Sequence, residues 1–325
     1  MPTMSVIEAI RDALQLEMAR DERVVVLGQD VGALGGVFRA SQGLFERFGE
    51  RRVVDMPLSE GMIVSSALGL ALSGLVPVAE VQFMGFTRQA FHQLTVQAAR
   101  YRFRSRGRFT ASLTIRSPFG GGARMPDLHA DAIEAQHANA PGLKVVMPAC
   151  PYDAKGMLLS AIRDPDPVLF CEPLRGYRGW REEVPEGDYT VPFGQARTVR
   201  EGSDITLVAW SAAVHLAERA ADRLAEEGVR CTVLDLRTLV PLDVEGLVRA
   251  VSATGRCLVV HEAPLTAGFG AEVVATIQEE AFYSLDAPIA RVAAPDTPYP
   301  PGTLEDTFLP NEERVCRAAR SILAA

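Results

Sequence analysis

The segment EGMIVSSALGLALSGLVPVAEVQF, residues 60–83, decides the fold. Glu60 opens it, and no charged residue follows over residues 61–79. Serines, glycines and a proline interrupt this apolar run. A helix over 60–73 followed by a strand over 75–83 therefore explains it better than a membrane span. A helix that leads directly into a continuously apolar strand is typical of a parallel sheet covered on both faces.

The same alternation of apolar strands and helices extends along the whole chain. Strands are predicted at 23–30, 51–57, 75–83, 111–118, 143–149 and 167–173, and again at 204–210, 231–238, 256–263 and 289–295. Helices are predicted at the N-terminus and at 41–49, 60–73, 86–104, 152–164, 211–228, 243–252, 269–282 and 311–324. This order predicts an α/β fold with two parallel-sheet domains.

A charged segment that bears proline and glycine and lacks periodicity separates the two halves of the chain. Such a composition is typical of a connection between domains. We therefore predict a first domain over residues 1–180, a linker over 181–193 and a second domain over 194–325.

Charge and cysteine content limit the partners and the compartment. The 325 residues carry a net charge of −8, which argues against nucleic acid or a membrane as partner, since both favour basic surfaces. Five cysteines without C-x-x-C spacing indicate reduced thiols and a cytoplasmic location. The N-terminus has capping-box spacing at Ser5 and Glu8 and lacks the basic and apolar regions of a signal peptide.

Motifs for nucleotides and metals are weak or absent. Residues 265–273, LTAGFGAEV, are similar to G-x-G-x-x-G, but Val273 stands at the third glycine position, which favours an ordinary helix N-terminus. The chain has no G-x-x-x-x-G-K-[ST] sequence, so we expect no P-loop. No histidines or carboxylates have the spacing of a zinc site.

Glu60 and His129 are the two candidate reactive residues. Glu60 has an ordinary explanation, because an acid in the first helical turn complements the helix dipole. Alternatively, apolar surroundings raise its pKa and let it exchange a proton with a ligand. His129 follows the glycine-rich loop at 119–122, where ligands of α/β sheets bind, although a single loop histidine is more often structural. We interpret the remaining histidines as structural: His92, His137, His215 and His261.

An ordered set of phrases covers nearly the whole chain and resembles one known family. The phrases are VLGQDVGALGGVFRASQGLFERFG, RVVDMPLSEGMIVSSALGLALSG, PVAEVQFMGF, TIRSPFGGG, LHADAIEAQ, PGLKVVMPACPYDAKGMLLSAIRDPDPVLFCEP, EEVPEGDYTVPFG, VLDLRTLVPLD and RVAAPDTPYP. Together they resemble the β subunit of the thiamine-diphosphate-dependent first component of 2-oxoacid dehydrogenase complexes. QFMGF and PDLHADAIEA are most similar to bacterial members that act on pyruvate. Branched-chain members tend to have Tyr in place of Phe86 and H-S-Q-S-P-E over 129–134.

The resemblance implies a fold and a division of labour between subunits. The first domain would be a pyrimidine-binding domain, and the second a transketolase C-terminal-type domain that dimerises and docks. Members assemble with an α subunit as an α2β2 heterotetramer and bind the lipoyl-acyltransferase core of the complex. The α subunit holds the diphosphate and Mg²⁺ through a G-D-G…N element, and this chain contains no G-D-G sequence.

The resemblance also implies roles for individual residues. Glu60 matches the glutamate that hydrogen-bonds N1′ of the aminopyrimidine. A proton held there favours the imino tautomer that generates the reactive carbanion. Leu58 and Phe86 match positions that line or stack on the pyrimidine. His129 matches a histidine that orients substrate or donates a proton during lipoyl acylation, and Ala130 replaces the usual serine beside it.

Some relatives bind a structural monovalent cation such as K⁺ through backbone carbonyls and a carboxylate. The matching positions in this chain are Ala111, Leu113, Thr114, Ala161, Asp164 and Asp166. Carbonyl ligands place little constraint on residue type, so this site rests on the resemblance alone.

Alternatives remain open at this stage. Within the same class, the substrate could be a branched-chain 2-oxo acid or acetoin instead of pyruvate. A second class is a non-catalytic scaffold subunit that docks the acyltransferase core. A third is a self-sufficient transketolase-like enzyme, which would need a diphosphate motif of its own and a longer chain.

Overall fold

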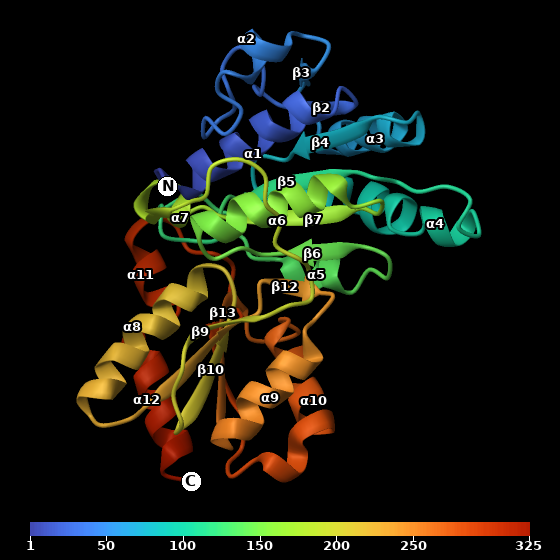
Figure 1. The fold of residues 1–325 in the computed structure, drawn as a ribbon. Helices are drawn as coiled ribbons and strands as arrows, with labels where there is room; N and C mark the ends of the chain where they lie inside the picture. The colour runs from blue at the N-terminus through green and yellow to red at the C-terminus, as the bar shows by residue number, and fades with distance from the viewer.

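The structure is a computed structural model that describes residues 1–325, and Figure 1 shows it as two lobes. The first lobe contains a seven-stranded sheet. Its strands in spatial order are β12 (Thr238–Val240), β6 (Lys144–Val146), β7 (Val168–Pro173), β5 (Thr114–Phe119), β4 (Val76–Glu80), β2 (Val24–Gly28) and β3 (Val53–Asp55). All neighbours are parallel except β12 and β6.

The second lobe contains a five-stranded sheet. Its strands in spatial order are β14 (Ala290–Ala294), β13 (Cys257–Pro264), β10 (Ile205–Ala209), β11 (Cys231–Asp235) and β9 (Arg197–Arg200). Only the edge strand β9 is antiparallel to its neighbour. The predicted α/β fold with two parallel-sheet domains is therefore confirmed.

Helices cover both faces of each sheet. In the first lobe they are α1 (Val6–Arg20), α2 (Leu44–Phe48), α3 (Glu60–Leu72), α4 (Tyr101–Arg104), α5 (Glu134–Ala138), α6 (Pro151–Arg163) and α7 (Gly176–Gly179). In the second they are α8 (Ala212–Glu226), α9 (Val244–Thr254), α10 (Gly270–Ala281), α11 (Glu305–Phe308) and α12 (Glu312–Leu323), with short 3₁₀ turns at Phe282–Ser284 and Gly302–Leu304. The predicted capping box of α1 is confirmed, since Glu8 N–H donates to the Ser5 hydroxyl and Ser5 N–H donates to the Glu8 carboxylate.

The strands are continuously apolar because each side chain must be buried on one face or the other. Val26 packs with α1 and α6, and its neighbour Leu27 packs with α3 on the opposite face. The α3 core extends across the lobe boundary to Trp210 and to α9 and α10. One continuous hydrophobic core therefore joins the two lobes.

The predicted helix over 86–104 is wrong as a continuous α-helix. The segment forms a 3₁₀ helix (Met84–Ala90), a π-helix (His92–Ala98) and the short α4. The hydroxyls of Thr87 and Thr95 donate to the carbonyls of Met84 and Phe91, so side chains compete for backbone acceptors of this segment. Irregular helices of this kind occur frequently at functional sites.

Four short strands were not predicted, among them the edge strand β9. β1 (Thr3–Ser5) pairs with β8 (Arg181–Glu183), so the first residues of the predicted linker are tied to the N-terminus. β12 follows shortly after β11 of the second lobe, yet it completes the sheet of the first lobe beside β6. The chain thus crosses between lobes again after the linker.

The helix α3 is less buried than the sequence suggests. Ile63, Val64 and Ala67 are buried in the core, but Met62 is 50% and Leu72 41% exposed. An apolar helix face that remains open in the single chain indicates a surface available for a partner. No helix of the structure is both long and apolar enough to cross a membrane.

Candidate functional site

Three segments of the first lobe meet at the N-terminus of α3. The segments are the start of α3, the 3₁₀ helix at 84–90 and the loop at 127–131. Gly61 lies against the carbonyl of Gln89, where an added Cβ would come within 3.2 Å of the oxygen. Gly85 lies so close to Leu128 that a Cβ would come within 2.1 Å of the Leu128 carbonyl oxygen. These close approaches require small residues and bring the three segments together.

Glu60 is the first residue of α3 and follows the N-cap residue Ser59. The Ser59 side chain makes no capping hydrogen bond. The acidic side chain of Glu60, in the first turn of the helix, complements the helix dipole. The Glu60 side chain is half-buried, and Leu58 beside it is 68% exposed. A carboxylate next to an uncovered leucine provides both a polar and an apolar contact for a ligand.

His129 is held in an aromatic slot. Its ring centroid lies 4.6 Å from that of Phe83 and 5.0 Å from that of Phe86, both edge-to-face. Its Nδ1 lies 3.0 Å from the Asp127 carbonyl oxygen. A carbonyl can only accept, so Nδ1 carries a proton and Nε2 remains for proton exchange in the neutral ring.

An ion pair fixes the loop that carries His129. Arg88, in the 3₁₀ helix, contacts Asp131 at 2.5 Å. The rings of Phe86 and His129 are in direct contact, with centroids 5.0 Å apart. Glu60 is brought toward this segment by its neighbour Gly61, which packs on the Gln89 carbonyl. Leu58 is two residues before Glu60 and is exposed. The roles predicted for Glu60, His129, Leu58 and Phe86 stay predictions.

A buried charge cluster lies under this site and was not predicted. Arg116 on β5 contacts Glu80 on β4 and Glu172 on β7, each at 2.7 Å. Tyr177 donates a hydrogen bond to Glu172. Burial opposes the charged form of Arg116, but the two carboxylates raise its pKa above the ordinary value. The sequence does contain a sign of this cluster, since each of three apolar strands carries one charged residue: Glu80, Arg116 and Glu172.

Of the four histidines interpreted as structural, His137 and His261 are buried, His215 is partly buried and His92 is exposed. His137 is buried and hydrogen-bonds Thr87 at 2.8 Å, and His215 contacts the Ala149 carbonyl at 2.8 Å. Burial lowers the pKa of both His137 and His261 to about 4. His92 lies on the π-helix.

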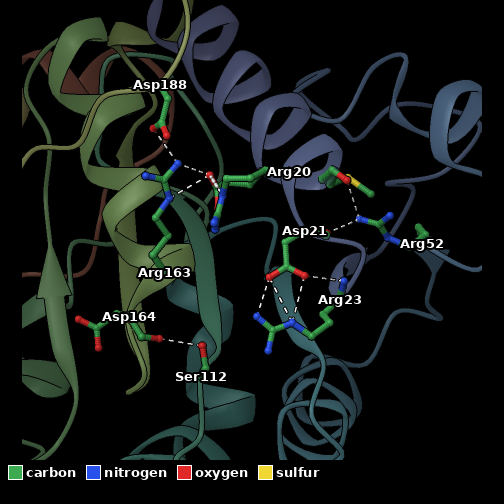
Figure 2. Close-up of polar contacts among 10 residues, drawn as sticks. Arg20, Asp21, Arg23, Arg52, Ser112, Arg163, Asp164 and Asp188 are labelled. Carbon is green, nitrogen blue, oxygen red and sulfur yellow. Dashed lines mark hydrogen bonds and ion pairs between the residues drawn. The ribbon is translucent and has the colours of Figure 1, made fainter.

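The residues predicted to hold a monovalent cation lie near one another at the edge of the first lobe. Figure 2 shows the Ser112 hydroxyl donating to the backbone carbonyl of Asp164, at 2.7 Å. The side chain of Asp164 accepts from Lys144 at 2.7 Å, and that of Asp166 accepts from Arg102 at 2.6 Å. Both carboxylates are thus already paired with protein cations.

Two backbone carbonyl oxygens of the predicted cation site each accept one hydrogen bond. Leu113 O accepts from Val168 N–H at 3.0 Å, and Ala161 O accepts from Asp164 N–H at 3.2 Å. Each carbonyl oxygen retains a second lone pair. Ala111 is buried beside them. The cation site stays a prediction. The structure has no group of three or more His, Cys, Asp or Glu side chains arranged to hold a metal ion.

Comparison with family models defines the class of the two lobes. The model of the transketolase pyrimidine binding domain matches residues 2–179, and that of the transketolase C-terminal domain matches residues 194–315. A solved structure described as a split gene transketolase, inactive beta4 tetramer, has a TM-score of 0.81 at 23% identity and covers 99% of this chain and 98% of its own. A transketolase mutant from Pichia stipitis has a TM-score of 0.71 at 15% identity over 99% of this chain and 46% of its own.

Curated relatives specify the family within that class. The pyruvate dehydrogenase E1 component subunit beta of Bacillus subtilis is 50% identical over 323 residues, and the alignment covers 99% of both chains. The corresponding subunits of Staphylococcus epidermidis and Staphylococcus aureus are 50% and 49% identical over the same share. The chain belongs to the family of pyruvate dehydrogenase E1 β subunits, within the transketolase-like proteins.

Proposed function

We propose that this chain is the β subunit of a first component that decarboxylates pyruvate and acylates a lipoyl group, in partnership with an α subunit. Identity of 50% over the full length with pyruvate dehydrogenase β subunits is the observation that carries this proposal. Branched-chain 2-oxo acids and acetoin are less well supported as substrates, because the curated relatives reported above are pyruvate enzymes.

The residues at the start of α3 fit the aminopyrimidine of thiamine diphosphate. An aminopyrimidine needs a carboxyl partner for a ring nitrogen and apolar contacts for its faces. Glu60 supplies the first, and Phe86 and Leu58 supply the second. When bound, thiamine diphosphate supplies the carbanion that attacks a 2-oxo acid. Glu60 would hold a proton at the N1′ position of the ring, and Phe86 would limit access of water.

His129 would exchange a proton through Nε2 when the acyl group passes to sulfur. Its Nδ1–H is engaged by the Asp127 carbonyl, which fixes the tautomer of the neutral ring. Opening of a lipoyl disulfide leaves one sulfur that must acquire a proton. An imidazolium that carries a proton on Nε2 as well as on Nδ1 can supply it, and the ring is then left neutral with its remaining proton on Nδ1.

The candidate cofactor site is incomplete in this chain, which supports an α partner that supplies the rest. Leu58 and Met62 are 68% and 50% exposed beside Glu60, so the site is uncovered on one side. The chain lacks a G-D-G sequence for the diphosphate and Mg²⁺. We propose that the α subunit supplies both of these functions and closes the site, in an α2β2 assembly.

Exposed side chains, cysteines and backbone carbonyls support further proposals about a docking partner, the location and a bound cation. The second lobe exposes Phe282 by 54% and Tyr283 by 98% at the end of α10, an apolar patch suited to docking the lipoyl-acyltransferase core. All five cysteines are free and buried, in keeping with a cytoplasmic location. A monovalent cation such as K⁺ would be held by carbonyl oxygens near Leu113 and Ala161, since Asp164 and Asp166 are paired.

Substitution of Glu60 tests the function. The variant Glu60→Gln, purified with the α subunit, is expected to assemble normally and to lose roughly 100-fold or more in pyruvate turnover. Assembly is checked by analytical ultracentrifugation. Near-normal turnover would contradict the catalytic role. Titration of thiamine diphosphate into the isolated chain tests whether the site is incomplete without the α subunit. Tight binding to the isolated chain would contradict an incomplete site.

A further inference from the structure

The imidazole of His129 depends on its neighbours for orientation, because the loop that carries it has little regular structure. Leu128, directly before it, has a positive φ of 69°, a conformation that a leucine adopts only when its surroundings impose it. The contacts that define the ring are the Asp127 carbonyl, Phe83 and Phe86. Phe86 is assigned to the aminopyrimidine under the proposed function, whereas Phe83 has no assigned role.

Phe83 is well suited to orient another ring, because its own ring is fixed from several sides. It is 4% exposed and lies three residues beyond the end of β4. Its centroid lies 5.5 Å from those of both Phe38 and Phe86. Phe38 in turn packs edge-to-face on Tyr177 at 5.4 Å. The row of rings Tyr177–Phe38–Phe83–His129 therefore extends from the core to the candidate site.

The row of rings is anchored at its inner end by charge. The Tyr177 hydroxyl donates to Glu172, whose carboxylate is paired with Arg116. All three residues are buried, and a buried network of ion pairs and hydrogen bonds restricts the motion of its members. The closest ring to His129 is Phe83, at 4.6 Å and 64° between planes, a favourable edge-to-face geometry.

We propose that Phe83 is a positioning residue for His129, holding the imidazole in the orientation in which Nδ1 donates to Asp127 and Nε2 exchanges the proton of acyl transfer. The proposal deepens the proposed function and rests on it, since it assumes that His129 serves the lipoyl step. Phe83 itself touches neither substrate nor cofactor. Loss of its ring should therefore impair the step that uses His129 and spare the step that uses Glu60.

Two assays on the α2β2 enzyme separate these steps. Oxidation of pyruvate with ferricyanide as electron acceptor reports decarboxylation without a lipoyl group. Acetylation of a lipoylated domain reports the full sequence. The variant Phe83→Met removes the ring at similar volume and is expected to lower kcat of lipoyl acetylation about tenfold. Ferricyanide turnover and the KM for pyruvate should remain within about twofold, since packing volume is conserved.

Matched variants make the result decisive. Phe38→Met conserves the volume that packs on Phe83 and leaves the contact between Phe83 and Phe86 in place. Because Phe38 does not itself contact His129, both assays should stay within about twofold. Phe83→Tyr keeps the ring and should restore lipoyl acetylation to within about threefold of wild type. Phe83→Leu replaces Phe83→Met if the methionine variant does not assemble. The pH profile of lipoyl acetylation should change in Phe83→Met and not in Phe38→Met.

The variant His129→Ala separates failure of this proposal from failure of the proposed function. It is expected to lose roughly 100-fold or more in lipoyl acetylation. If His129→Ala is impaired and Phe83→Met behaves like Phe38→Met, Phe83 is not a positioning residue. If His129→Ala acetylates normally, His129 has no role in the step and both assignments fail. Equal losses in both assays for Phe83→Met would indicate general damage to the site and would also overturn the proposal.

Discussion

The indole N–H of Trp210, at the end of β10, donates a 3.3 Å hydrogen bond to the carboxyl group of Glu134, which begins α5 in the other lobe. Both residues are buried, and the second oxygen of Glu134 has no partner. Burial raises the pKa of Glu134 to about 7. The boundary between the lobes therefore contains an acid that loses its proton near neutral pH.

The raised pKa predicts a pH-dependent gain for the variant Glu134→Gln. Below about pH 4.5 the carboxyl is protonated in the folded and unfolded chains, and the variant should match wild type. Between about 4.5 and 7 the unfolded chain loses its proton first, so wild type loses stability as pH rises. The variant should therefore be more stable at pH 8 by up to about 3 kcal/mol, measured from unfolding midpoints over a pH series.

The exposed residue Glu226, on α8, provides the control. Glu226→Gln removes an exposed carboxylate and supplies the baseline pH series with which Glu134→Gln is compared. A constant offset between Glu134→Gln and wild type at every pH would show that the carboxyl group does not titrate between 4.5 and 7.

Replacement of Ser211 by glycine is a second change that should stabilise the protein. Its φ of 51° and ψ of −131° place it at the first central position of a type II′ turn, which the Ala213 N–H closes on the Trp210 carbonyl at 3.2 Å. Glycine is the residue suited to this position. Its buried hydroxyl also has no partner. Ser211→Gly should stabilise the protein by about 1 kcal/mol, as measured by thermal unfolding.

The variant Ser211→Ala divides this effect into its two causes. It removes the unpaired hydroxyl but keeps the Cβ at positive φ, so it should gain less than Ser211→Gly. If alanine stabilises as much as glycine, backbone strain at this position contributes nothing.

Removal of Arg116 from its cluster with Glu80 and Glu172 should destabilise the protein strongly. Arg116→Met leaves two carboxylates buried without a cation and should reduce the free energy of unfolding by about 3–5 kcal/mol. Arg124→Met breaks the exposed pair with Asp306 and should change it by less than about 1 kcal/mol. Urea denaturation compares the two. Equal effects would mean that the buried cluster is no more important than a surface pair.

The carbonyl oxygens near Leu113 and Ala161 predict an effect of K⁺. If they bind a monovalent cation, KCl should raise the unfolding midpoint by roughly 2 °C or more over choline chloride at the same ionic strength. The salt comparison removes general screening, which is the same for both. Identical midpoints in the two salts would argue against a cation at these carbonyls.

Much of the fold was predictable because continuous apolar strands and amphipathic helices have local signatures. The predicted helix 60–73 corresponds to α3, Glu60–Leu72, and the predicted strand 167–173 to β7, Val168–Pro173. The broken helix over 84–104 and the position of β12 were not predictable. Both depend on contacts made with distant segments, which a local pattern does not contain.

The candidate site was predictable in part, and mainly through resemblance. Local reasoning left Glu60 with an ordinary role as a helix-terminal acid, and the structure agrees with that role as well. Phe83 gave no signal, because a buried aromatic residue after a strand is common in any core. Its significance depends on the distance to His129, which lies 46 positions further along the chain, from 83 to 129.

The position of β12 has a consequence for synthesis on the ribosome. The sheet of the first lobe lacks its last strand until residues 238–240 have left the exit tunnel, although the rest of that lobe is made by residue 183. Until then β6 is an open edge that can pair with other nascent chains. A truncated product that ends at the linker would keep this edge permanently, so the first lobe is complete only as part of the longer chain.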